Sequence, residues 1–284
     1  MTRLPPHLRF GFLVAVSLVV CWMPLVETFA LALRRAEYTH ILLILPVSVA
    51  LLFTEWPSLL SEHKPGGHIG IPLLFGATVI ALAGRVSAAG DVRMFWGMVA
   101  LVTWWLGSFA VCFGTSTFRS LMFPLCFLFW LAPLPEQALN KAIALWQHGS
   151  ALSASVLFSA VGIPVTQDGT VLSIPGLTLE VAQECSSLRS SLMLVVTSMV
   201  MAHLFLRSNW RKAAVIAVAI PLSIAKNGVR IFTISMLGTR VNPEFLHGNL
   251  HHHGGILFFL LALFGVLLLL WFFSRSENRL CDSL

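Results

Sequence analysis

The sequence predicts an all-α integral membrane protein with about eight transmembrane helices. Hydrophobic residues make up 57% of the 284 residues and charged residues only 11%, whereas soluble domains contain about 25% charged residues. The mean hydropathy of +0.85 agrees with this class. Apolar runs long enough to cross a hydrocarbon core of about 30 Å, which takes about 20 helical residues, recur along the chain. They lie at approximately 10–33, 39–55, 68–84, 94–115, 119–134, 185–206, 211–237 and 253–274.

The segments around these runs complete one expected transmembrane domain, residues 1–284. No small-residue cleavage pattern follows the first run, so we expect an uncleaved anchor. Residues 135–162 are less apolar and favour an interfacial helix. In residues 163–184, Asp-Gly and Pro-Gly turn signals separate β-branched residues, which predicts a small β-hairpin or a pair of hairpins. Strand edges cannot face lipid, so this loop lies in water or against protein.

The lysines and arginines of the loops predict the orientation. The net charge is +6, and because aromatic and basic residues do not cluster, it indicates lipid and topology, not nucleic acid. With the N-terminus inside, the inner segments carry nine Lys and Arg residues and the outer segments six, and the ratio is five to one over the last three spans. We therefore expect an inner-membrane protein with both termini in the cytoplasm and the 163–184 loop outside. The outer set is Arg34, Arg35, Arg85, Arg93, Lys141 and Arg240.

One of the five cysteines has polar neighbours. Cys185 lies in VAQECSSLRSS, between Glu184 and Ser186, at the outer start of a span. A helix start favours the thiolate form, which is the reactive one. The alternative is that Cys185 is a small packing residue. The other four lie in apolar runs or in the C-terminal tail, and their spacing shows no disulfide or C-x-x-C metal pattern.

Polar residues of three consecutive spans reach the same depth in this topology. Arg230 lies seven residues before the outer end of its span, about 10 Å deep, and HGNLHHHGG opens the last span from outside. An ionisable group inside a membrane costs at least about 2.5 kcal/mol. We therefore expect Lys226 and Arg230 to have a functional or structural role that offsets this cost. They could snorkel, or pair with Glu180 or Glu184 only to hold the spans together. Asn227 shares a helical face with Arg230 and can orient it.

A thiol, an arginine and a histidine at one depth support nucleophilic attack on an acyl carbon. The thiolate attacks the carbon, a histidine takes the proton of the thiol or forms an ion pair with the thiolate, and the arginine stabilises the oxyanion. Spacing alone does not choose among the histidines, and a histidine-rich tract can also bind metal. The candidates are His247, His251, His252 and His253.

The motifs VAQECSSLRSS, KNGVRI and HHHGGILFF, in this order on three spans, resemble the exosortase/archaeosortase family of membrane transpeptidases. The family pattern is approximately V-A-x-x-C-S-G-[LI]-R, then N-x-x-R-[IV], then H-x-x-x-G-x-x-x-F. Upstream, EYTHILLILPVS (37–48) is similar to the family's Y-S-H motif and FPLCFLFWLAPLP (123–135) to its F-P…P-x-P segment. Ser187 departs from the family pattern, which has glycine there, so we expect a pocket that is slightly narrower or gains a hydroxyl.

The resemblance implies Cys185 as the nucleophile and Arg230 as the catalytic arginine. Gly255 and Phe259 align with the end of the histidine motif, which implies His251 as the catalytic histidine. Arg189 matches the arginine of the cysteine motif and is expected to position the substrate or support the thiolate. The other expected supporting residues are Asn227, Ser186, Glu184, His40 and His253.

By resemblance, the substrate is a secreted protein whose C-terminal sorting signal has a Pro-containing motif, a transmembrane helix and a basic tail, as in PEP-CTERM sorting. The product passes from a thioester to an acceptor amine, a lipid or water, without a cofactor or metal. One alternative is a transporter or channel that uses Lys226, Arg230 and the histidines, but that function predicts polar residues spread through the bilayer depth. A histidine-rich metal-binding membrane protein is the other alternative.

Overall fold

The computed structural model describes residues 5–55, 67–87, 90–181, 188–246 and 255–282. Six of the described helices are long and apolar enough to cross a membrane, and up to eight spans result if each of two bent helix pairs counts as one. The predicted all-α membrane fold with a small β-structure is therefore confirmed. The chain divides into two compact units, residues 1–138 and 139–284.

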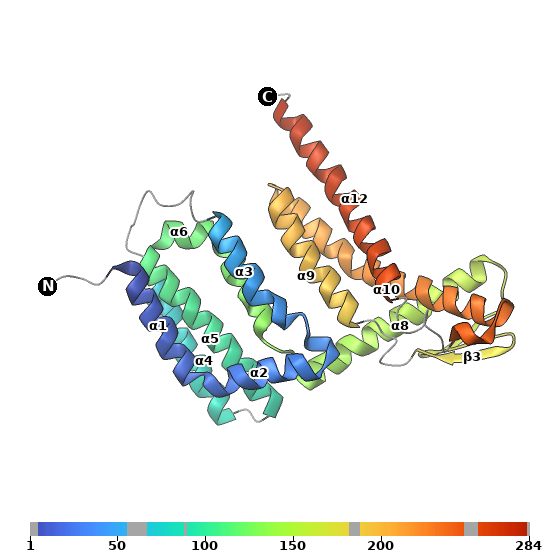
Figure 1. The fold of residues 1–284 in the computed structure, drawn as a ribbon, viewed down its shortest axis with the longest axis horizontal. Coiled ribbons are helices and arrows are strands. Elements are labelled where there is room, and N and C mark those ends of the chain that lie inside the picture. The colour runs from blue at the N-terminus through green and yellow to red at the C-terminus, as the bar shows by residue number, and fades with distance from the viewer. Residues whose placement is uncertain (1–4, 56–66, 88–89, 182–187, 247–254, 283–284) are drawn as a thin grey trace. The chain divides into compact units, whose positions relative to one another are not determined.

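The first unit is built around one buried helix, α5, against which α1, α2 and α4 pack. Figure 1 shows α1, α4 and α5 side by side. Indole N–H groups of α5 tie it to α1: Trp104 donates to the carbonyl of Leu13 at 3.2 Å and Trp105 to the hydroxyl of Ser17 at 2.9 Å. The elements are α1 (Pro6–Val20), α2 (Trp22–Arg34), η1 (Ala36–Tyr38), α3 (Ile41–Glu55), α4 (Gly67–Ser87), α5 (Gly90–Phe113), α6 (Thr115–Ser120), α7 (Met122–Phe127) and η3 (Leu128–Leu131).

Two of the predicted spans are broken in the first unit. The run at 10–33 forms α1 and α2, which meet at 76°. Pro24 has no N–H to donate to the carbonyl of Val20 four residues earlier, so the helix breaks at that turn. The Arg85 guanidinium donates to this carbonyl instead, at 3.1 Å. The run at 119–134 forms α6, α7 and η3, and Pro124 follows the break at Leu121 in the same way.

Two glycines let α4 and α5 approach closely. A Cβ atom added to Gly107 would lie 2.9 Å from the Leu74 nitrogen and 3.0 Å from the Gly70 carbonyl oxygen. Real Cβ atoms almost never approach backbone atoms this closely, and backbone does not move aside as a flexible side chain does. The contact therefore requires glycine on α5.

We expect Gly107→Ala to lower the Tm of the purified protein by several degrees, which corresponds to overpacking by about 1–3 kcal/mol. Gly76→Ala on α4 is the matched control, because a Cβ atom there meets nothing within 4 Å. The control should keep or raise the Tm, since alanine favours a helix over glycine by about 1 kcal/mol. Equal effects of the two substitutions on thermal unfolding in detergent would contradict the close packing.

The second unit contains a small sheet and three long helices, together with most of α8 (Figure 1). The strands pair antiparallel in the order β1-β2-β3, which is the predicted pair of hairpins. Gly169 and Gly176 take positive φ angles of 60° and 83° in the two connecting turns, a conformation that glycine adopts without strain. The elements are α8 (Glu136–Ala160), β1 (Thr166–Asp168), β2 (Val171–Ile174), β3 (Leu177–Glu180), α9 (Leu188–Phe205), α10 (Asn209–Arg240), η5 (Pro243–Leu246) and α12 (Gly255–Asp282).

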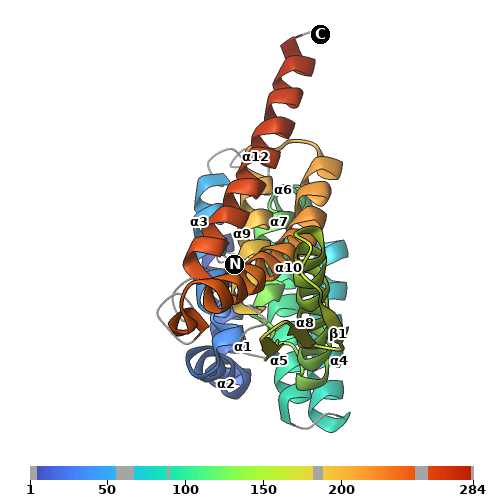
Figure 2. The same cartoon turned by 90° about the vertical axis from the view of Figure 1, so that its right-hand side faces the viewer.

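Helix α10 belongs to both hydrophobic cores of the second unit. Val215 and Leu222 pack with α9 and α12, whereas Ile231, Phe232 and Met236 pack with α8 and the sheet. Figure 2 shows α10 between α12 and the strands. The sheet therefore covers the C-terminal part of α10 and not the part that packs with α9 and α12.

Candidate active site

The residues predicted for the active site fall partly outside the described ranges. Cys185, Glu184, Ser186, His251 and His253 lie outside them, as do His247 and His252. The cysteine motif runs directly into α9, whose first residue is Leu188. The histidine motif runs directly into α12, whose first residue is Gly255. The described site therefore consists of these two helix starts and the polar residues of α10.

Lys226 on α10 joins the three motif segments. Its side chain is only 5% exposed. Its Nζ donates a hydrogen bond to the hydroxyl of Ser190 in the first turns of α9, and it lies 5.7 Å from the ring centroid of Phe259 on α12. Ser190 follows the arginine of the cysteine motif, and Phe259 ends the histidine motif. The three motif segments thus meet at one level of the second unit.

Asn227 fixes this part of α10 against α8. The side chain is 1% exposed, and its Nδ2 donates to the hydroxyl of Ser150 at 3.0 Å. The next residue, Gly228, brings the helices close, because a Cβ atom added there would lie 3.0 Å from the Ala154 nitrogen and closer still to Ser153. The orientation of Arg230 by Asn227 stays a prediction, while the bond to Ser150 shows that Asn227 sets where this turn of α10 lies.

Arg230 lies at the boundary between the two cores. It is half-buried and follows Lys226 by one helical turn, so the two cations share a face of α10. The next residues, Ile231 and Phe232, already pack with α8 and the sheet. Helix α10 extends to Arg240, ten residues beyond Arg230, or about 15 Å of helix. The guanidinium is therefore placed where α10 passes from the three-helix core to the sheet.

Arg189 and His40 have different surroundings. Arg189 is exposed in the first turn of α9, where it can meet a ligand that approaches this helix start.

His40 is buried in the first unit. Its Nδ1 lies 3.1 Å from the carbonyl oxygen of Glu37, and its ring lies edge-on to the ring of Trp130, with 6.0 Å between the ring centroids. The nearby Tyr38 hydroxyl donates to the carbonyl of Leu134 at 2.7 Å. The two upstream segments, 37–48 and 123–135, thus pack together.

A family model described as transmembrane exosortase matches residues 32–268. The chain belongs to the transmembrane exosortase family. The matched range contains all five segments on which the resemblance was based. No curated protein matches the chain, and no solved structure does.

Lys226 has contacts that the sequence did not predict. From its place inside a span, the sequence predicts that Lys226 snorkels or pairs with Glu180 or Glu184. The structure shows a hydroxyl and an aromatic ring as its contacts, and Glu180 is exposed. The four-residue spacing from Arg230 was the available signal, because it predicts that both cations face the same side of the helix.

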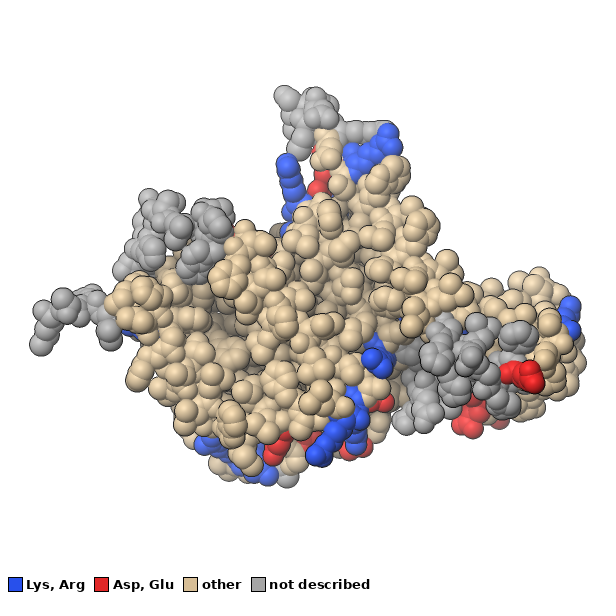
Figure 3. All heavy atoms as spheres, viewed as in Figure 1, with Lys and Arg blue, Asp and Glu red and all other residues tan. Residues whose placement is uncertain are grey.

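The opposite end of the three-helix core carries a different cluster. Glu277 of α12 accepts the backbone N–H groups of Arg207 and Ser208 at 2.9 and 3.0 Å, and its carboxylate lies 3.5 Å from the Arg211 guanidinium. Lys and Arg side chains gather beside this end of α12 (Figure 3). The α9–α10 loop and the C-terminal part of α12 are therefore at one end, away from the motif residues.

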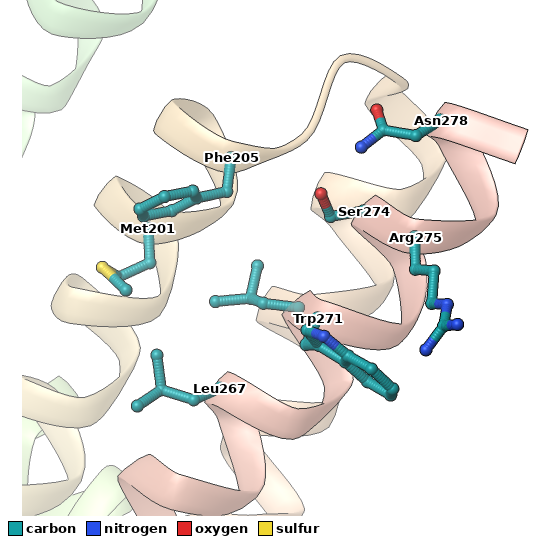
Figure 4. Close-up of a pocket in the computed structure, with 8 residues that line it drawn as sticks. Met201, Phe205, Leu267, Trp271, Ser274, Arg275 and Asn278 are labelled. Atoms are coloured by element: carbon teal, nitrogen blue, oxygen red, sulfur yellow. The ribbon is translucent and has the colours of Figure 1, made fainter. Parts of the chain in front are cut away.

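A groove of about 540 Å³ also lies at this end, between α9 and α12. Met201, Phe205 and Leu267 form its apolar part, and Ser274 and Asn278 approach it from α12 (Figure 4). None of the described residues that line the groove is a predicted catalytic residue. The groove is therefore distinct from the candidate active site.

Proposed function

We propose that this exosortase is a cysteine transpeptidase that cleaves the C-terminal sorting signal of secreted proteins. The signal consists of a Pro-containing motif, a transmembrane helix and a basic tail. Membership of the transmembrane exosortase family supports the class of enzyme. The observation that carries the proposal is the position of Lys226, whose contacts bring together the helices that follow the cysteine and histidine motifs and the helix that bears Arg230.

The proposed chemistry assigns one role to each of three residues. The Cys185 sulfur attacks the scissile carbonyl, and Arg230 stabilises the negative oxygen of the tetrahedral intermediate. The C–N bond then breaks, and the amine leaves with a proton from His251. An acceptor amine or water finally breaks the thioester and releases the thiol. Arg189, exposed beside this helix start, is proposed to position the substrate.

The proposed orientation has the cysteine and histidine motifs at the outer membrane–water interface and both termini in the cytoplasm. The basic cluster around Arg207 and Arg211 supports this, since basic residues favour the cytoplasmic side. An impermeant thiol reagent applied to cells from outside is expected to label Cys185 and to miss Cys281 until the membrane is opened. Labelling of Cys281 alone in intact cells would reverse the orientation.

Processing of a co-expressed substrate tests the function directly. The substrate is a secreted reporter that ends in a Pro-containing motif, a transmembrane helix and a basic tail. We expect a shortened reporter only when the exosortase is present, and an unchanged reporter when its helix is deleted. Transport of ions or solutes by the purified protein, without any reporter cleavage, would instead support the transporter alternative.

Lys226→Met should separate a functional role of this lysine from a structural one. Methionine keeps the length of the side chain without a charge, and replacing a buried charge by an apolar group is often neutral or stabilising. We therefore expect the Tm to change by no more than about 2–4 °C. Reporter cleavage should fall about tenfold, because a cation one turn from Arg230 no longer strengthens the positive field there.

Leu222→Met on the same helix is the control, since Leu222 packs against the hydrophobic core of α9, α10 and α12 and leucine and methionine have similar volumes. This variant should retain cleavage. A Lys226→Met protein with a much lower Tm and a proportionate loss of cleavage would show that Lys226 serves only to hold the helices together.

A further inference from the structure

A cavity of about 870 Å³ lies in the first unit where α2, α4 and α5 meet beside the α1–α2 bend. Three arginines line it, one from each helix: Arg34 ends α2, Arg85 lies in the last turn of α4, and Arg93 lies in the first turn of α5. The helix break at Cys21 opens this space, because α2 turns away from the axis of α1. Pro24, which follows this bend, is also one of the residues that line the cavity.

The charges around the cavity do not cancel. Two carboxylates, Glu27 and Asp91, share its lining, and one oxygen of Asp91 accepts the backbone N–H of Glu136 at 2.6 Å. Within the part of the chain that the structure describes, none of the three arginines forms an ion pair with either carboxylate. All three arginines are exposed residues. Arg85 uses one of its N–H donors on the Val20 carbonyl, and a guanidinium has five, so the cavity presents a net positive charge with further N–H donors.

The rest of the lining is apolar, so the cavity suits an amphiphile. A volume of 870 Å³ exceeds what a single inorganic anion fills and lies in the range of pockets for larger ligands. Guanidinium groups match the oxygens of a phosphate in pairs, and basic pockets between transmembrane helices recognise lipid head groups. The apolar members of the lining are Val20, Met23, Pro24, Ala30, Leu31, Ala81 and Met94.

We propose that this cavity binds the phosphate head group of an anionic phospholipid, with the acyl chains along its apolar wall. The proposed topology supports this site. Arg34, Arg85 and Arg93 all belong to the outer set that opposes the usual cytoplasmic bias of basic residues, and here they line one cavity. A bound anion offsets their mutual repulsion. The site does not depend on the proposed transpeptidase activity.

Native mass spectrometry of the detergent-purified full chain, titrated with phosphatidylglycerol, tests the site. Arg34→Gln and Arg93→Gln should each weaken binding about fivefold, the effect of removing one basic residue near an anionic head group. Arg35→Gln is the matched control, because Arg35 follows Arg34 directly and does not line the cavity. Glu27→Gln should strengthen binding about fivefold, because it removes a negative charge from the lining.

The titrations distinguish a specific lipid site from general surface charge, from a site for free phosphate and from loss of fold. A loss of affinity that is equal in all three arginine variants would show general surface charge and overturn the site. Failure of phosphatidylglycerol to bind would overturn it as well. Inorganic phosphate that competes as effectively as phosphatidylglycerol at equal concentration would overturn the lipid assignment. An unchanged Tm for each variant excludes loss of fold as the cause.

Discussion

Replacing Cys185 by alanine is expected to abolish reporter cleavage. The thiolate forms the bond to the scissile carbonyl carbon, and no other step in the proposed reaction replaces it. Loss of a nucleophile that works together with a base typically costs more than about 10⁴-fold in rate. Cleavage should therefore fall to the level of cells without the exosortase, as measured by the fraction of shortened reporter on an immunoblot.

Two further variants make the result specific. Cys126→Ala, at an exposed position on α7, should retain full cleavage and shows that loss of a thiol as such is harmless. Cys185→Ser should be as inactive as Cys185→Ala, because a hydroxyl is not ionised as a thiol can be. Measurable cleavage by a correctly inserted Cys185→Ala protein would exclude Cys185 as the nucleophile.

Much of the fold could be predicted because its elements depend on local sequence. The long apolar runs predict α4, α5, α9, α10 and α12, and the Asp-Gly and Pro-Gly signals predict the two turns of the sheet. A periodic pattern of apolar residues, or a glycine in a turn, acts within a few residues and can be seen in the sequence.

The helix break at Cys21 could not be predicted with the same rules. Proline is tolerated near the start of a helix and in several interior positions here, including Pro46 and Pro72, so Pro24 alone did not require a bend. The bend also needs a partner for the carbonyl of Val20, and Arg85 supplies it from 65 residues away in the chain. Such a contact depends on packing, which a single sequence does not reveal.

In the candidate site, too, local sequence motifs could be read in advance, whereas contacts between distant segments could not. The motifs predict that three helices carry it, which stays a prediction, and the contacts of Lys226 show that segments of these three helices lie together. The partner of Asn227, Ser150, was not predicted, because it lies on α8 and not on a helix that bears a motif. Helix α8 therefore holds the turn of α10 that bears Asn227, although α8 contributes none of the predicted catalytic residues.

Arg230→Gln is expected to reduce the rate of reporter cleavage about 10²–10³-fold, which is the usual cost of removing one oxyanion donor. Glutamine keeps an N–H donor, but its side chain is shorter than that of arginine and carries no charge. Arg230→Lys should also lose about 10²-fold, because lysine supplies a point charge without the planar fork of donors. Purified exosortase and a peptide substrate in detergent would give kcat and KM separately.

The separate constants identify the role of Arg230. A donor that acts mainly on the oxyanion lowers kcat and kcat/KM together, whereas a residue that only binds the substrate raises KM with kcat unchanged. Arg240→Gln is the matched control, since Arg240 is exposed at the end of the same helix, and this variant should behave as the wild type. A large rise in KM with normal kcat for Arg230→Gln would assign this arginine to substrate binding and leave the oxyanion role to another donor.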